Sequence, residues 1–198
     1  MGVDRRNKSE KTDEAQRTFN EIKAMTINVF VSISCAARLG LIAAISGCLF
    51  DLGGNLGDTT FAVLGGAADF NSVVELPEGT DPDHVESTLR SLPELADAKV
   101  SVQAFTLSPI HAASAQVTHR ITVSGGDRPG LVARLSEVFV EFGVNIVRLN
   151  AERIPSSVGT VYGVIMAVHI PRQMAASCLA TVANTAGSLG LTCHWEEM

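Results

Sequence analysis

The chain has 198 residues, of which 46% are hydrophobic and 18% are charged, and its net charge is −6 at pH 7. The sequence has no local cluster of Lys and Arg that could offset this negative charge. Affinity for nucleic-acid phosphates comes from basic side chains, so direct binding to nucleic acid is excluded. The length allows two small domains. The apolar composition predicts that a neighbouring domain or subunit covers part of the surface, and we therefore expect a homodimer.

Residues 1–25 combine six basic and five acidic side chains with few large apolar ones. Such a segment cannot bury enough apolar surface to offset the entropy that it loses on ordering, so we expect a flexible charged tail. It also lacks the uninterrupted apolar core that a signal peptide needs, which predicts a cytoplasmic protein.

Residues 29–50 are apolar enough to be compared with a membrane span. Arg38 lies near the middle of this stretch, and a mid-bilayer Arg costs about 3 kcal/mol on insertion scales. The matching stretch later in the chain carries several charged residues. We therefore predict no membrane association.

One sequence pattern occurs twice, at residues 40–55 and 130–145. In both copies, apolar residues recur at the three-and-four spacing of an amphipathic helix, and subtracting 90 from each number of the second copy gives the first. The shared residues are Gly40, Gly53 and Asn55 in the first copy, and Gly130, Gly143 and Asn145 in the second. An ungapped match of this length indicates a tandem duplication.

The helix of the first copy is expected to be apolar on two faces. At the positions where the second copy exposes mostly charged residues, the first copy has Ala44, Gly47 and Phe50. We expect this second face to be an interface with the other copy or with another subunit.

The remaining elements follow the same order in both copies. The predicted strands are residues 27–33, 61–65, 70–76, 98–107, 117–123, 144–154, 161–170 and 191–196, and the predicted helices are residues 41–52, 80–93, 131–142 and 172–188. Two βαβ crossovers per copy predict an α+β protein with two ferredoxin-like βαββαβ domains, each an antiparallel sheet with both helices on one face. The domains are expected at residues 26–107 and 117–198, joined by a linker at residues 108–116.

The candidate chemistry lies at one corner of the second copy. Pro129 is expected at the first helical position, and Gly130 is expected to permit close approach. The backbone N–H groups at the start of this helix favour a carboxylate, Asp127 can accept from an ammonium group, and the Asn145 amide can both donate and accept. These groups suit an amino-acid zwitterion. The alternative is that Asp127 only caps the helix and Asn145 only tolerates a tight turn.

The stretch GDRPGLVARLSEVFVEFGVNI closely resembles the signature of ACT domains, which are small βαββαβ regulatory modules. The motif positions are held by Asp127, Arg128, Pro129, Gly130, Leu131, Gly143, Asn145 and Ile146. The resemblance covers both copies, and a chain of two such modules without an attached enzyme looks like the family of glycine cleavage system transcriptional repressors.

This resemblance implies a non-enzymatic, amino-acid-responsive regulator. Its effector would be glycine or a similar small amino acid, and it would contact a DNA-binding activator rather than DNA. The implied ligand-binding residues are Asp127, Arg128, Gly130, Leu131, Asn145 and Ile146. Two alternatives stay open: a ligand-free protein interaction module, and a separate regulatory subunit of an amino-acid metabolic enzyme.

The first copy departs from the family pattern. Ala37 stands where the second copy has its acidic residue, and Leu39 stands where it has proline. A weaker site, or none, is therefore expected at the positions that remain, which are Arg38, Gly40, Leu41 and Asn55.

No motif indicates catalysis, a metal or a cofactor. The four cysteines lie in apolar runs without C-x-x-C spacing and the histidines are dispersed, so reduced packing cysteines are favoured. Neither a nucleophile elbow nor a phosphate-binding glycine loop is present.

Overall fold

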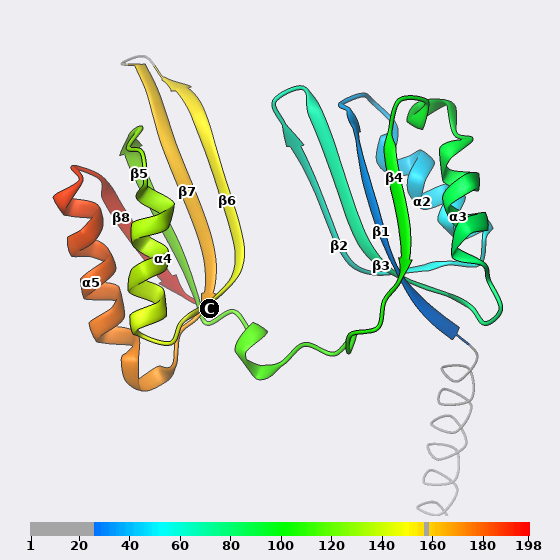
Figure 1. Ribbon diagram of the computed structural model, residues 1–198. Coiled ribbons are helices and arrows are strands. Elements are labelled where there is room, and N and C mark those ends of the chain that lie inside the picture. The colour runs from blue at the N-terminus through cyan, green and yellow to red at the C-terminus, as the bar shows by residue number, and fades with distance from the viewer. Residues whose placement is uncertain (1–25, 157–158) are drawn as a thin grey trace, which may run out of the picture. The chain divides into compact units, whose positions relative to one another are not determined.

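The computed structural model describes residues 26–156 and 159–198, and it divides the chain into two compact units (Figure 1). Unit 1 is Met1–Pro109 and unit 2 is Ile110–Met198, so the division falls inside the predicted linker. The predicted tail at residues 1–25 lies outside the described residues.

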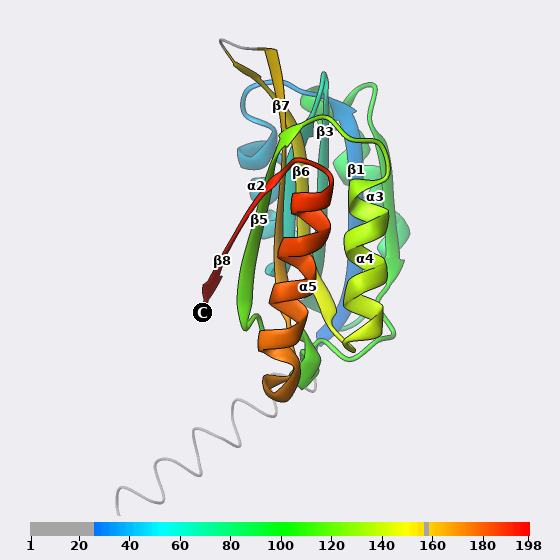
Figure 2. The same ribbon diagram turned by 90° about the vertical axis from the view of Figure 1, so that its left-hand side faces the viewer.

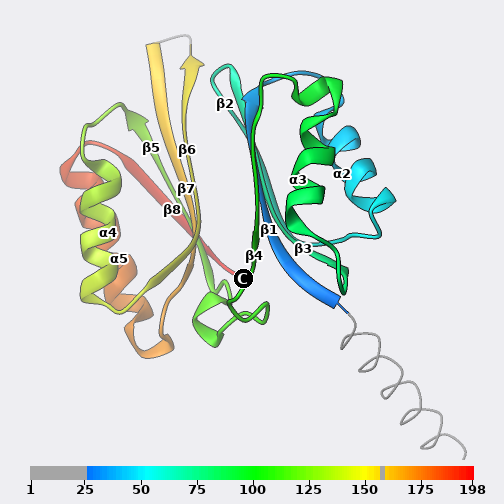
Figure 3. The same cartoon turned by 45° about the vertical axis from the view of Figure 1, so that its right-hand side comes forward.

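Unit 1 has the element order β, α, β, β, α, β. Its elements are β1 (Thr26–Ala36), α2 (Leu41–Asp51), β2 (Asn55–Leu64), β3 (Ala67–Pro77), α3 (Pro82–Arg90) and β4 (Lys99–Ala104), with a short 3-10 helix at Pro93–Leu95. The sheet is antiparallel in the order β2-β3-β1-β4. Figure 3 shows α2 and α3 on one face of this sheet.

Unit 2 repeats this arrangement. Its elements are β5 (His119–Gly126), α4 (Leu131–Glu141), β6 (Asn145–Ser156), β7 (Gly159–His169), α5 (Ala175–Ser188) and β8 (Thr192–Glu197), with 3-10 helices at Ala113–Ala115 and Arg172–Met174. The antiparallel sheet has the order β6-β7-β5-β8. Figure 2 shows α4 and α5 side by side over it. The predicted fold class is therefore confirmed in both units.

Each unit has its own core between its sheet and its helices. In β1, Val29, Val31 and Ile33 are buried while the intervening residues are not, which is the period of two of a strand covered on one face. The helices supply the opposing layer at three-and-four spacing, for example Leu41, Ile45 and Leu49. Unit 2 has the same pattern, and its His119, which stands 90 residues after the buried Val29, is 7% exposed.

Strand β2 is longer than the sequence pattern indicated, because it begins at Asn55 rather than near residue 61. Every residue of β2 is exposed, and its pairing with β3 is irregular between Leu56 and Thr59. An edge strand without a buried face carries no alternation from which it could be predicted.

The glycines that flank the first helix of each unit have left-handed backbones. Gly143 has φ 64° and follows the end of α4, where a left-handed glycine is common. Gly130 has φ 83° and precedes α4, and a Cβ there would meet nothing within 4 Å. The described residues therefore make no close approach at Gly130. The placement of Pro129 at the first helical position is wrong, because α4 begins at Leu131.

No helix in the described part of the chain, residues 26–156 and 159–198, combines the length and the apolar character needed to cross a membrane.

Replacing Gly54 with Ala should lower the free energy of unfolding by about 2 kcal/mol, because the added Cβ would lie 2.7 Å from the Leu49 carbonyl oxygen. Gly47→Ala in α2 is the matched control. A Cβ at that position meets nothing within 4 Å, and Ala is favoured over Gly in a helix by about 1 kcal/mol. Denaturant unfolding measures both variants, and equal effects would contradict this account.

Candidate functional site

The start of α4 leaves its first backbone N–H groups available. The N-cap residue Gly130 has no side chain, and among the described residues no side chain caps the helix. The Leu131 N–H donates to the Arg128 carbonyl oxygen (3.2 Å), but the next N–H groups have no partner within the helix. The positive end of the helix dipole lies at the same point, so this terminus favours a carboxylate.

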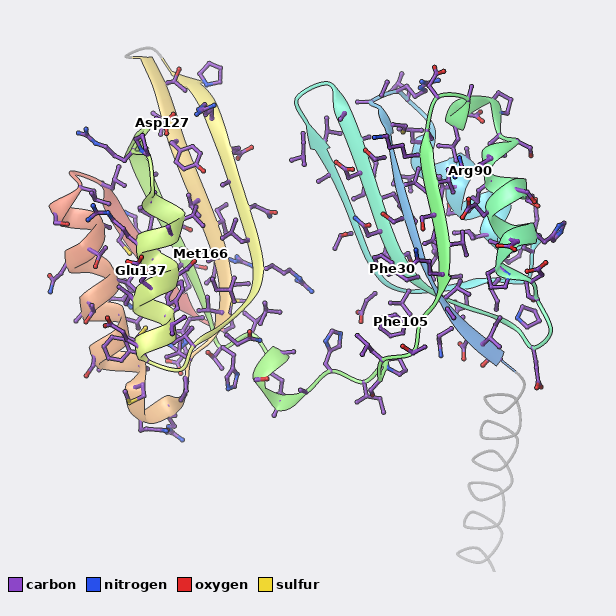
Figure 4. All side chains as sticks on the ribbon, in the orientation of Figure 1. Phe30, Arg90, Phe105, Asp127, Glu137 and Met166 are labelled. Atoms are coloured by element: carbon purple, nitrogen blue, oxygen red, sulfur yellow. The ribbon has the colours of Figure 1, made fainter. Side chains whose placement is uncertain are left out.

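Asp127 does not cap this helix, so the capping alternative is wrong. Instead, Nε of Arg153 donates to Asp127 Oδ2 (2.9 Å), and Nη2 of Arg153 lies 2.9 Å from the same oxygen in an ion pair. Figure 4 shows Asp127 at the end of unit 2 where α4 begins. The pair is largely in water, since the two side chains are 69% (Arg153) and 40% (Asp127) exposed.

Arg153 is the residue that sequence reasoning missed at this corner. It lies on β6, 26 residues after Asp127, and only the pairing of β6 with β7 brings it to this end of the sheet. Neither helical spacing nor a local motif links the two residues, so the sequence carried no signal for the pair.

Asn145 lies at the opposite end of α4 from Asp127. The helix has 11 residues, which corresponds to a rise of about 16 Å, and Asn145 follows its end as the first residue of β6. Within unit 2, the structure therefore does not bring Asp127 and Asn145 into one cleft. Asn145 does not take a left-handed turn conformation either, because the described residues with positive φ are all glycines.

Asn145 instead holds the segment that leads into β5. Its Nδ2 donates to the Ser114 carbonyl oxygen (2.8 Å). Beside it, His169 lies opposite Asn145 in the ladder, and its Nδ1 donates to the Gln116 carbonyl oxygen (2.9 Å). Both bonds fix the end of the predicted linker to unit 2.

The other predicted residues at this corner differ in what they offer. Arg128 is exposed, so its guanidinium can reach a ligand. The Leu131 side chain is 1% exposed and belongs to the core, so Leu131 offers backbone only. Ile146 is half-buried and packs against the same core.

The corresponding corner of unit 1 is less polar. The Ala37 N–H donates to the Gly66 carbonyl oxygen (2.9 Å), and Arg38 is exposed beside it. Gly40 precedes α2 with φ 85°, and Leu41 is buried as its counterpart is. Asn55, at the start of β2, again lies past the far end of the helix.

The predicted interface residues lie on α2. Phe50 is 76% exposed and Gly47 is also exposed, whereas Ala44 is half-buried. Unit 1 therefore leaves an apolar surface on this helix.

The described residues, 26–156 and 159–198, contain no group of three or more His, Cys, Asp or Glu side chains that could hold a metal ion. Burial raises the pKa of Cys178 to about 11. Burial also raises the pKa values of Cys35, Cys48 and Cys193. These thiols are poor nucleophiles at neutral pH, because only the thiolate reacts.

A double-mutant cycle on Asp127→Ala and Arg153→Ala should give a coupling energy below about 1 kcal/mol, because exposed ion pairs are screened by water and lose side-chain entropy. Denaturant unfolding of the two single variants and the double variant measures it. A coupling of several kcal/mol would show that the pair is desolvated.

Residues 120–195 match the family model of the ACT domain. Among solved structures, the chain resembles an unknown protein from Galdieria sulphuraria, with 22% sequence identity, a TM-score of 0.71, and coverage of 87% of this chain and 99% of that chain. It also resembles a proposed glycine cleavage system transcriptional repressor, with 13% identity, a TM-score of 0.60, and coverage of 87% and 98%. No curated protein sequence matches. The chain therefore has a two-domain ACT-like fold, in which the second unit carries the ACT domain sequence.

Proposed function

We propose that this protein is a non-enzymatic regulator that binds a small amino acid, such as glycine, at the start of α4. The observation that carries the proposal is the open helix terminus beside Asp127, which lies in the unit that matches the ACT domain. A free amino acid has one carboxylate and one ammonium group, and this corner offers complementary partners for both.

The two ends of the ligand would be recognised separately. Its carboxylate would accept from the first-turn N–H groups of α4, with the Arg128 guanidinium nearby. Its ammonium group would donate to Asp127. Nε and Nη2 of Arg153 both contact Oδ2, and a carboxylate has about four lone-pair sites, so Asp127 can still accept from an ammonium group.

The regulator would act through a protein partner, and the likeness to a proposed glycine cleavage system transcriptional repressor favours transcriptional control of glycine-cleavage type. The net charge of −6 disfavours a direct contact with DNA. An apolar surface on α2, defined here as Ala44, Gly47 and Phe50, would contact a protein such as a DNA-binding activator.

A ligand-free interaction module is the second candidate. The observation that favours it is the separation of Asp127 from Asn145 along α4, which leaves unit 2 without a single cleft containing both residues. Such a module needs the α2 surface but no effector.

Amino acids tested one at a time should identify the effector by thermal unfolding. A ligand at 100 times its dissociation constant should stabilise the wild-type chain by about 2.7 kcal/mol. Asp127→Asn should remove this response, because it removes the charge that holds the ammonium group. Glu137→Gln is the control, since Glu137 is exposed on the same helix but lies beyond its first turn. If no amino acid stabilises the protein, or if Asp127→Asn responds as wild type does, the site is rejected.

Phe50→Ser should abolish capture of the protein partner from cell extract without lowering stability, because Phe50 is 76% exposed. Val140→Ser is the matched control, since Val140 is the repeat counterpart of Phe50 on α4 and is 79% exposed. Capture followed by mass spectrometry identifies the partner. Equal losses in the two variants, or none in Phe50→Ser, would exclude the α2 surface as the contact.

A further inference from the structure

The ion pair between Asp127 and Arg153 leaves part of each side chain unused. Nε and Nη2 of Arg153 both contact Oδ2 of Asp127, at 2.9 Å in each case. Among residues 26–156 and 159–198, neither Oδ1 of Asp127 nor Nη1 of Arg153 has a partner. A carboxylate oxygen accepts hydrogen bonds, and Nη1 carries two N–H donors. The pair therefore offers a free anionic acceptor and free cationic donors within one small group.

Arg153 projects from the face of the sheet that the helices cover. It lies opposite Tyr162 in the ladder between β6 and β7, and Tyr162 packs against the core of unit 2. Residues directly opposite in a ladder lie on the same face of the sheet. The guanidinium is therefore on the same side of the sheet as α4, at the end where Asp127 precedes that helix.

The described residues leave open space around this pair. A Cβ added at Gly126 or at Gly130, on either side of Asp127 and its neighbours, would meet no atom within 4 Å. Arg153 is 69% exposed and Asp127 is 40% exposed. A small molecule can therefore approach both side chains.

Val63 is the counterpart of Arg153 in unit 1. Each lies on the second strand of its unit, opposite a third-strand residue that also pairs with the first strand, and the two first-strand residues are 90 positions apart. The two sets are Val63, Ala68 and Cys35 in unit 1, and Arg153, Tyr162 and Gly125 in unit 2. Unit 1 therefore lacks both partners of the ion pair, since Ala37 stands in the place of Asp127.

Stability does not account for the pair. Unit 1 has the same fold without either charged residue, and exposed ion pairs contribute at most about 1 kcal/mol. Both partners occur together in the unit that matches the ACT domain, and both are missing from the other unit. Joint presence and joint absence favour a shared task at this corner.

We propose that Arg153 binds the carboxylate of the ligand while Asp127 binds its ammonium group, so that the ion pair recognises both charges of an α-amino acid. This inference rests on the proposed function and adds a binding residue to that site. The N–H groups at the start of α4 then share the carboxylate with the guanidinium.

The neutrality of the pair explains why a zwitterion is the fitting ligand class. An α-amino acid carries its ammonium and carboxylate groups on one carbon atom, and its net charge is zero. The pair also has no net charge and offers one partner to each of these groups. An amine without a carboxylate, or an acid without an ammonium group, would leave one half of the pair unused.

Isothermal titration calorimetry of the full-length chain with glycine, L-alanine and L-serine, and with the amide of each, tests this assignment. The amides keep the ammonium group but lack the carboxylate, and they stay protonated at about pH 6.5 because the pKa of an α-amino group is near 8. Arg153→Ala should weaken binding of the amino acid by about tenfold, because it removes a charge-assisted hydrogen bond. Binding of the amide should be the same in Arg153→Ala and in wild type.

Two further variants control the measurement. Arg153→Lys should recover part of the lost affinity, because lysine keeps the charge but not the planar fork of donors. Arg120→Ala should bind as wild type does, since Arg120 is another exposed arginine of unit 2, 3.8 Å from Glu196 in an ion pair of its own. Circular dichroism verifies that each variant is folded.

The possible failures are distinguishable. If wild type binds an amino acid and Arg153→Ala binds it equally well, the inference alone is overturned. If Arg153→Ala weakens the amino acid and its amide by the same factor, Arg153 only positions Asp127 and does not bind the carboxylate. If wild type binds none of the three amino acids, the proposed function fails and this inference fails with it.

Discussion

The packing of two helices against one face of a four-stranded sheet is the constraint on which both units depend. Val31 and Ile121 are both 0% exposed on the central strands, and the helix residues Leu49 and Leu135 are 0% exposed against them. Burying one such side chain contributes about 1.5–3 kcal/mol, so the two cores outweigh any surface ion pair in this chain. Because each core is closed within its own unit, the loops, helix ends and strand edges are free to differ between the copies.

In each unit, the glycine before the first helix leaves the helix N-terminus without a side-chain cap, and this open terminus is the candidate site. A left-handed residue lets the strand turn directly into the helix, but glycine has no side chain with which to cap it. The open N–H groups are therefore common to both units. What distinguishes unit 2 is the acidic residue beside them, and the partner of that residue, Arg153, reaches it only through the pairing of β6.

The two copies differ on the outer surfaces of their first helices. Unit 1 has an apolar outer face on α2, whereas the outer face of α4 in unit 2 is mostly charged. Such differences leave the fold unchanged because the side chains that differ on the outer faces of α2 and α4 lie outside the two cores.

The sequence alone determined the duplication, the order of the elements and the buried positions, because burial of one face imposes a period on strands and helices that is visible residue by residue. It also located the glycines that end the helices. It did not locate the start of β2, where no residue is buried, and it misplaced Pro129, which precedes α4. Only the tertiary structure decided which polar groups meet. It separated Asp127 from Asn145 by the length of a helix, and it paired Asp127 with Arg153. Contacts between side chains on different elements depend on strand register, which local sequence does not encode.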